Sequence, residues 1–142
     1  MEALLKLFYA ILAFGILIFF HELGHFLMAK LMRVKVLTFA LGFGKKLLKL
    51  RVGETEYAVC AVPLGGYVKM LGEDQQEKIP TQDLPRAFSN QSVARRFIIV
   101  LAGPVFNLLL AAAIVSLLHL GEVPYLPARI QQVLEDSPAS LA

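Results

Sequence analysis

The chain has 142 residues, of which 57% are hydrophobic and 18% are charged, whereas soluble domains carry about 25% charged residues. Its mean hydropathy is +0.64, which argues against an ordinary soluble domain and favours a protein embedded in a lipid bilayer. The net charge of +3 comes without interleaved aromatic and basic residues, so no nucleic-acid partner is expected. Because Cys60 is the single cysteine, an internal disulfide and a thiolate metal cluster are excluded, and we expect a small core residue in a strand.

The first apolar stretch runs from about Leu4 to Met32 and predicts a transmembrane helix, because it can cross roughly 30 Å of hydrocarbon. The alternative is a cleaved signal peptide, with Lys6 as its positive charge. No small-x-small cleavage site follows within reach, and a metal motif would have no purpose on a removed segment. We therefore expect this helix to be retained.

Residues 21–25 of that stretch read His-Glu-Leu-Gly-His and follow directly on an uncharged apolar run. Imidazoles at i and i+4 on a helix lie about 40° apart around the axis and about 6 Å apart along it, so His21 and His25 can reach one metal ion. Zinc takes nitrogen ligands readily, and Glu22 can accept a proton from the water that attacks a carbonyl. Because the helix is apolar on every side, the pattern predicts hydrolysis inside a membrane. The alternative is a pair of interfacial histidines with Glu22 reaching to water, but such groups beside a membrane-spanning run usually mark a functional site.

Three runs rich in β-formers follow the first helix, over residues 34–40, 47–52 and 56–62. Glycine-bearing segments punctuate them, and we expect a small antiparallel β-region between residues 34 and 70 with exposed edges. Glycines permit close approach of another backbone, so Gly42, Phe43 and Gly44 are candidate substrate-binding residues for β-strand addition. An ordinary sheet with glycine turns explains the same residues equally well.

The second apolar stretch, from Phe97 to Leu120, carries no charged residue and predicts a second transmembrane helix over roughly residues 92–120. Ser89 or Asn90 is expected to cap it. His119, near the far end of the helix, is expected to be interfacial and not a third zinc ligand.

Depth along the two helices brings Asn107 to the level of the motif. At 1.5 Å per residue, His21 lies about 18 Å from Arg33, and Asn107 lies about 16 Å from Arg96. If both arginines sit near one membrane surface, the two polar sites share a depth. A lone asparagine in apolar surroundings should face the bundle interior, where it either bonds a substrate backbone or clamps the helices.

Twelve of the fourteen Lys and Arg residues fall between Lys30 and Arg96. By the positive-inside rule, the connecting region lies in the cytoplasm and both chain ends lie outside it.

Four motifs occur together and in a characteristic order. They are His21-Glu22-Leu23-Gly24-His25, Gly42-Phe43-Gly44, Pro63-Leu64-Gly65-Gly66-Tyr67-Val68-Lys69-Met70 and Ala102-Gly103-Pro104-Val105-Phe106-Asn107. Over nearly the whole chain they resemble the site-2 protease family of intramembrane zinc metalloproteases, and most closely its bacterial branch of regulator-of-sigma-E proteases. The resemblance implies a Zn²⁺ site from His21 and His25, Glu22 as catalytic base, and a membrane-associated β-hairpin that presents substrate.

The same resemblance implies single-pass membrane substrates such as anti-sigma factors, cleaved in regulated proteolysis at the bacterial inner membrane. It divides the chain into transmembrane helix 1 (1–33), a cytoplasmic loop with the β-hairpin (34–91), transmembrane helix 2 (92–120) and the truncated start of a periplasmic PDZ-like domain (121–142). The expected fold is thus a mainly α membrane protein.

One departure from the family concerns the third zinc ligand. Members take it from an aspartate on a later membrane helix, which this chain does not reach, and none of its own acidic residues is well placed as a substitute. We therefore expect the N-terminal part of a protease, inactive alone. The alternative is a non-catalytic membrane protein that binds substrate segments by β-strand addition.

Overall fold

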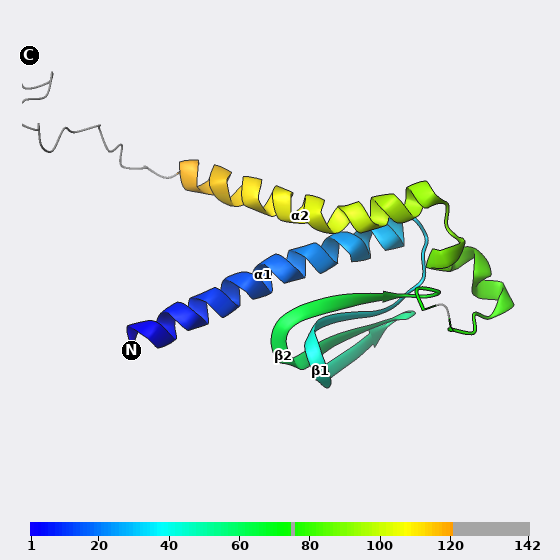
Figure 1. The fold of residues 1–142 in the computed structure, drawn as a ribbon, viewed down its shortest axis with the longest axis horizontal. Helices are drawn as coiled ribbons and strands as arrows, with labels where there is room; N and C mark the ends of the chain where they lie inside the picture. Colours follow the sequence, from blue (N-terminus) through cyan, green and yellow to red (C-terminus); the bar gives the residue numbers. More distant parts are fainter. Residues whose placement is uncertain (75, 121–142) are drawn as a thin grey trace, which may run out of the picture.

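The computed structural model describes residues 1–74 and 76–120, so the expected start of a PDZ-like domain lies outside the described residues. Two long helices, α1 (Glu2–Leu31) and α2 (Val93–Leu120), run in opposite directions and contact each other near the end of α1 (Figure 1). They diverge toward the start of α1 and the end of α2. A sheet of β1 (Val36–Val52) and β2 (Thr55–Met70) lies beside α1. Two short 3-10 helices, η1 (Thr81–Arg86) and η2 (Phe88–Asn90), lead into α2.

Both long helices are apolar and long enough to cross a membrane, as the sequence predicted. A lipid-embedded segment must satisfy its backbone hydrogen bonds internally, and a helix does so. The first half of α1 is exposed almost all the way round, which suits a helix surrounded by lipid. The fold is therefore that of a mainly helical membrane protein with a small sheet.

The end of α1 is closed by a residue in the left-handed conformation, Arg33, with φ of 61°. Its N–H bonds to the carbonyl of Lys30, and the N–H of Val34 bonds to that of Ala29. These two bonds form a Schellman motif, which satisfies the last carbonyls of the helix and turns the chain toward the sheet. The next residue, Lys35, donates its N–H to Arg86 and accepts from the N–H of Leu71, so the start of β1 is bonded on both sides.

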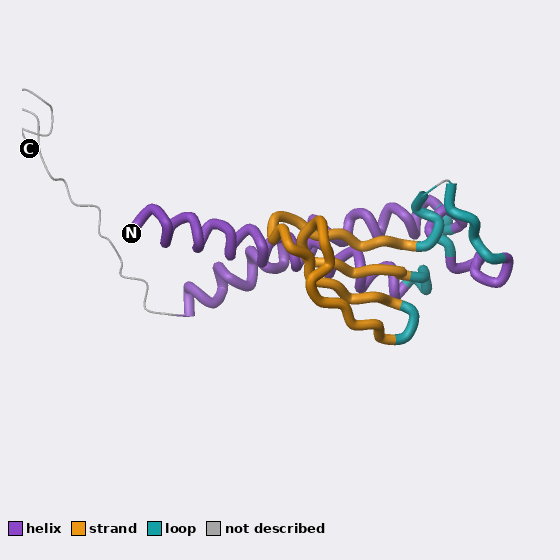
Figure 2. Tube along the Cα trace, turned by 90° about the horizontal axis from the view of Figure 1, so that it is seen from below, coloured by secondary structure: helices purple, strands orange, loops and turns teal. Residues whose placement is uncertain are grey.

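The three expected β-runs are joined into two long antiparallel strands. The glycines expected to separate the runs lie inside the strands, where Gly42 and Gly44 have φ of 84° and 82°. Glycine adopts this conformation without steric cost, so β1 bends there and stays in the sheet. The first half of β1 therefore pairs with β2 twice, and Ala40 lies between Ala58 and Tyr67 (Figure 2). The chain turns from β1 into β2 at Gly53 and Glu54.

A buried apolar cluster fills the junction of α1, the sheet and α2. Its members are Ala29, Val34, Val36, Phe39, Val68, Met70 and Ile99. Beside it, the hydroxyl of Thr55 donates to the carbonyl of Val36 at 2.8 Å, which satisfies a buried polar group. Cys60 is buried in β2, as expected.

Glu54 in the hairpin turn holds the sheet to two other elements. It accepts hydrogen bonds from Arg86 at 2.6 Å and from Lys30 at 3.2 Å. The bond from Arg86, followed by that from Lys30, lowers the pKa of Glu54 to about 2 against the opposing effect of burial. The turn is thereby tied to the end of α1 and to η1.

The cap of α2 is Ser92, and the expectation of Ser89 or Asn90 is wrong. Ser89 and Asn90 belong to η2, whereas the hydroxyl of Ser92 accepts from the N–H of Arg95 at 3.4 Å. The sequence rule for caps was sound, but the intervening 3-10 turn moves the start of the helix to Val93.

Candidate metal centre

The two histidines of the motif lie one turn apart on α1 and face α2. Their ring centroids are 4.8 Å apart, in an edge-to-face arrangement. The predicted i, i+4 placement is thus confirmed, and both rings are partly buried between the helices.

His25 is held by the backbone of α2. Its Nδ1 lies 2.8 Å from the carbonyl oxygen of Ile99. A carbonyl can only accept a hydrogen bond, so Nδ1 carries a proton, and in the neutral ring the lone pair then lies on Nε2. This is the tautomer that a histidine ligating a metal through Nε2 needs.

His21 faces Asn107 on the same face of α2. The side-chain amide Nδ2 of Asn107 lies 3.3 Å from Nδ1 of His21. The predicted common depth of the motif and Asn107 is therefore confirmed. Asn107 Oδ1 is buried and has no hydrogen-bond partner among the described residues.

Glycines let the two helices approach closely at the motif. A Cβ on Gly24 would lie 2.8 Å from the carbonyl carbon of Ala102, and one on Gly103 would lie 2.6 Å from Cε1 of His25 and 2.8 Å from Cε1 of His21. Real Cβ atoms do not come so close to other atoms. Gly103 therefore leaves the space in which both imidazoles lie against α2.

Glu22 points toward the sheet. A Cβ on Gly66 would come within 3.1 Å of the Cγ of Glu22, so the last part of β2 passes directly beside the carboxylate. A cavity of about 380 Å³ lies here, and its lining includes Glu22, His25, Gly66 and Tyr67. A second cavity of about 350 Å³ is lined by His21, Glu22, Asn107 and apolar residues of α1. The carboxylate and the imidazoles therefore reach spaces where a peptide could lie.

The donor set fits a zinc ion, since two imidazoles one helical turn apart lie beside a carboxylate that can act as base. Catalytic zinc sites have three protein ligands, however. Within residues 1–74 and 76–120, no three His, Cys, Asp or Glu side chains gather closely enough to hold a metal. His119 bonds to the carbonyl of Val115 on its own helix and is exposed, as expected for a residue outside the site.

The candidate substrate-binding residues Gly42, Phe43 and Gly44 lie at the bend of the sheet. Gly42 lines a cavity of about 380 Å³ between α1 and the sheet, and a Cβ there would overlap the carbonyl of Val62. The ring of Phe43 stacks on Tyr67 at a centroid distance of 6.4 Å. The close approach at Gly42 is thus made by the sheet itself, and the role of these three residues toward a substrate stays a prediction.

Two groups of this site were missed from the sequence, the carbonyl of Ile99 and the α-carbon of Gly103. A backbone carbonyl carries no residue-type signal. The spacing of Gly103 and Asn107, four apart on one helix face, was the available sign that α2 approaches the motif closely.

These features define a membrane protein with a paired-histidine site between two helices, and comparison with known proteins identifies its family. The family model described as "Peptidase family M50" matches residues 9–138. The chain belongs to this family, whose members are the site-2 proteases.

Three similar proteins are each named as a "putative zinc metalloprotease". The chain is 51% identical over 130 residues to that of Clostridium acetobutylicum, which covers 92% of this chain and 37% of the relative. It is 54% identical over 117 residues to that of Ralstonia nicotianae, and the match covers 76% of this chain and 25% of the relative. It is 40% identical over 134 residues to that of Thermotoga maritima, and the match covers 94% of this chain and 26% of the relative. The matched part thus covers between 25% and 37% of the length of these relatives.

Proposed function

We propose that this chain supplies two zinc ligands and the catalytic base of an intramembrane zinc metalloendopeptidase of the site-2 type. The observation that carries the proposal is the placement of His21, Glu22 and His25 on a membrane-length helix, with Nδ1 of His25 bonded to the Ile99 carbonyl. Membership of the M50 family and the zinc metalloprotease names of the relatives support it. In this proposal the third ligand is an aspartate on a later membrane helix of the full-length protein, as the family resemblance implies.

Each side chain has a distinct task in the proposed reaction. His21 and His25 hold zinc, which when bound polarises the scissile carbonyl as a Lewis acid. The carboxylate of Glu22 takes a proton from the attacking water and passes it to the leaving amine. The apolar helices around the site limit access of bulk water, which strengthens these electrostatic interactions.

The proposed substrate is an extended segment of a single-pass membrane protein, such as an anti-sigma factor. The last part of β2 pairs with β1 on one side only, and its other edge is unpaired within the described structure. This edge passes the cavity that Glu22 and His25 line. An added substrate strand would bond to its free N–H and C=O groups, which brings a peptide bond beside the carboxylate.

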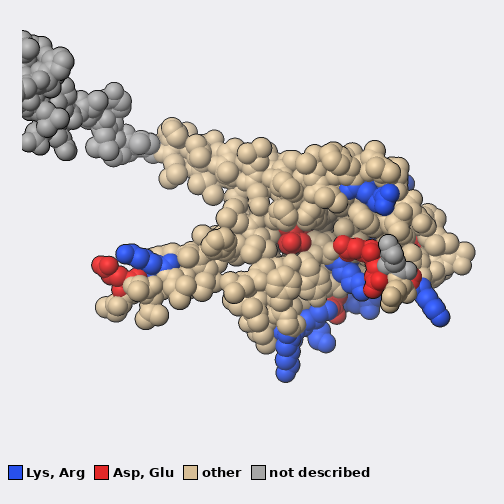
Figure 3. Space-filling model, viewed as in Figure 1, with Lys and Arg blue, Asp and Glu red and all other residues tan. Residues whose placement is uncertain are grey.

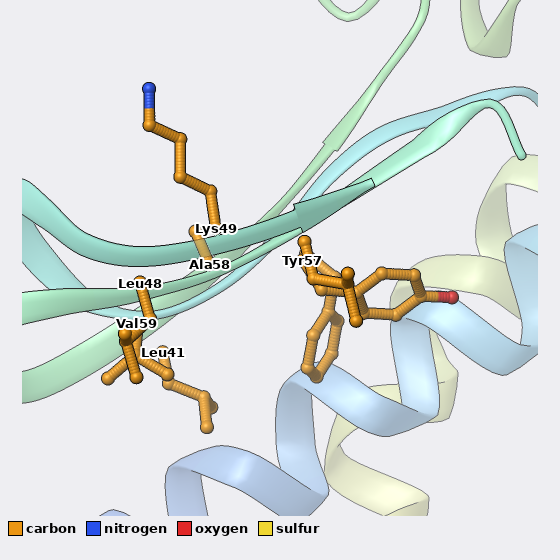
Figure 4. Close-up of a pocket in the computed structure, with 8 residues that line it drawn as sticks. Leu41, Leu48, Lys49, Tyr57, Ala58 and Val59 are labelled. Carbon is orange, nitrogen blue, oxygen red and sulfur yellow. The ribbon is translucent and has the colours of Figure 1, made fainter. Parts of the chain in front are cut away.

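The lipid bilayer is the second proposed partner, and the face of the sheet that is turned toward α1 supports this. An apolar hollow of about 440 Å³ lies there, lined in part by Leu41, Leu48 and Val59. The side chain of Lys49 extends away from these apolar side chains (Figure 4). Leu48 is 68% exposed, so this surface suits the membrane interface, with the lysine reaching to headgroups.

The proposed orientation places the sheet and the loops in the cytoplasm of a bacterium, at the inner membrane, and the N-terminus outside. Figure 3 shows the basic side chains gathered mainly over the sheet, the loops and the adjoining helix ends, whereas most of α2 is uncharged on the face shown. This distribution supports the positive-inside argument.

The test uses the full-length protein that carries this chain, with a single-pass membrane substrate. Glu22→Gln should retain zinc and lose cleavage by orders of magnitude, because both imidazoles remain but the proton acceptor is gone. His21→Ala or His25→Ala should lose zinc and cleavage together, whereas His119→Ala should change neither. Full cleavage by Glu22→Gln would refute the catalytic role of Glu22. Substrate binding without cleavage by the wild-type protein would favour the alternative, a non-catalytic membrane protein that binds substrate by β-strand addition.

A further inference from the structure

The two metal-ligating candidates are approached by one stripe of α2. Ile99, Gly103 and Asn107 follow each other at intervals of four residues, so they lie on the same helix face. The carbonyl of Ile99 bonds to Nδ1 of His25, and the amide of Asn107 faces Nδ1 of His21. Gly103, midway between them, leaves room for both rings.

The geometry of a helix explains why a backbone carbonyl contacts His25 at one end of the stripe, whereas a side chain contacts His21 at the other end. Helix carbonyls point toward the C-terminus, so that of Ile99 points along α2 toward Gly103. Side chains tilt toward the N-terminus, so the amide of Asn107 reaches back toward Gly103. The two groups converge, which matches them to histidines that are only one turn apart on α1.

The amide of Asn107 can present either of two ends to His21. With Nδ2 facing the ring, Nδ1 must be the acceptor and the proton lies on Nε2, which blocks metal binding there. A half-turn of the planar amide exchanges its oxygen and nitrogen with almost no change of shape. Oδ1 then accepts from a protonated Nδ1, and Nε2 of His21 is free to bind a metal.

We infer that Asn107 is a positioning residue that holds His21 in the metal-binding tautomer through Oδ1, as the Ile99 carbonyl does for His25. This inference rests on the proposed zinc site. Metal-ligating histidines commonly donate their second ring N–H to an oxygen, and loss of that partner costs about 10–100-fold in metal affinity. Oδ1 is buried and has no hydrogen-bond partner among the described residues, so it is available to accept this bond.

The experiment measures zinc affinity of the full-length protein in detergent, by competition with a chelator. Asn107→Leu keeps about the same volume but has no acceptor, and should weaken zinc binding about 10–100-fold. Asn107→Asp keeps an oxygen acceptor and should bind zinc within a few-fold of wild type. Ser116→Leu is the matched control, because Ser116 is exposed on the same helix far from the motif, and it should leave affinity unchanged.

A second readout is independent of affinity. Nitrogen-15 NMR of histidine-labelled, zinc-loaded protein should show Nδ1 of His21 protonated and hydrogen-bonded in wild type and in Asn107→Asp. In Asn107→Leu the hydrogen-bond shift of that nitrogen should be absent, while the signals of His25 remain.

The outcomes separate the positioning role from the zinc site itself. Equal zinc affinity of Asn107→Leu and wild type would overturn the inference, and so would equal weakening in the leucine and aspartate variants. Either result would leave the zinc site intact. If His21→Ala binds zinc as tightly as wild type, the proposed function fails and the inference fails with it.

Discussion

Nδ1 of His25 and the carbonyl oxygen of Ile99 lie 2.8 Å apart, although 74 residues separate them in the chain. This bond joins the motif helix to the second helix at the level of the proposed metal. It also determines which ring nitrogen of His25 carries the proton, since a carbonyl cannot donate. One hydrogen bond therefore both joins α1 to α2 and places the proton of His25 on Nδ1.

Because α1 and α2 pack closely at Gly24, we expect a single added methyl group there to lower the stability of the folded protein. Gly24→Ala should lower the stability of the folded protein by about 1–3 kcal/mol, because the new Cβ meets the backbone of Ala102 and must push the helices apart. Gly15→Ala is the matched control on the same helix, where an added Cβ has no described atom within 4 Å apart from its chain neighbours and the nearby backbone of its own helix. It should be neutral or slightly stabilising. Unfolding in mixed detergent micelles measures both, and equal stability of the two variants would contradict the close contact.

The hairpin turn should respond to acid through Glu54. Arg86 lowers the pKa of this carboxyl to about 2, from 4.5 in the unfolded chain. A lowered folded-state pKa means that the stabilisation is fully present above pH 4.5 and is lost progressively as the pH falls toward 2. Glu54→Gln should remove about 1 kcal/mol at neutral pH, since the ion pairs are partly exposed, and should flatten the acid limb of the stability curve.

The control for this prediction is Glu2→Gln. Glu2 pairs with Lys6 at 3.7 Å, but both side chains are at least 80% exposed, so its removal should have no measurable effect. Identical acid limbs for wild type and Glu54→Gln would show that the turn is held by packing alone.

The orientation argued from the basic residues can be tested by fusion. A reporter that is active only outside the cytoplasm should be silent when fused near Glu77 and active when fused near Gly121, because the positive-inside rule places the connecting region in the cytoplasm. A cytoplasm-specific reporter at the same two points is the control and should give the reverse pattern. Activity of the first reporter near Glu77 would overturn the proposed topology.

Substrate addition at the β2 edge predicts a pattern of cross-links. In a Cys60→Ala, Glu22→Gln background, Tyr67→Cys should form a disulfide with a cysteine near the cleavage site of a membrane substrate when an oxidant is added to isolated membranes, because the reducing cytoplasm does not form the bond by itself. Tyr67 lies on the free edge and lines the cavity that holds Glu22. Leu48→Cys, on the opposite edge strand, is the control and should not react. Stronger cross-linking at Leu48 would place the substrate at the opposite edge of the sheet, along the second half of β1.

The sequence predicted the parts of this fold that depend on local periodicity. Residues 21–25 follow an apolar run that can only be a helix at that length, and counting the rise from Arg33 and Arg96 was enough to bring Asn107 to His21. The sheet was predicted as separate runs, because the bends at Gly42 and Gly44 are decided by pairing with distant residues of β2. Local sequence does not encode that pairing.

The groups that complete the site belong mostly to the backbone, and the position of a backbone group cannot be recognised from the residue type. The carbonyl of Ile99 could belong to any residue type, and the importance of Gly103 appears only when the rings of the other helix lie against it. The cap at Ser92 was missed because a short 3-10 turn at Phe88–Asn90 delays the start of α2.

The left-handed residue at the end of α1 has a mechanical consequence for the whole molecule. Arg33 turns the chain within one residue, and the backbone bonds of Val34 and Lys35 leave no slack between α1 and β1. These hydrogen bonds therefore limit rotation of the sheet relative to α1 at this connection. Glu22 and the strand edge beside it are therefore expected to keep their relative placement when a peptide binds.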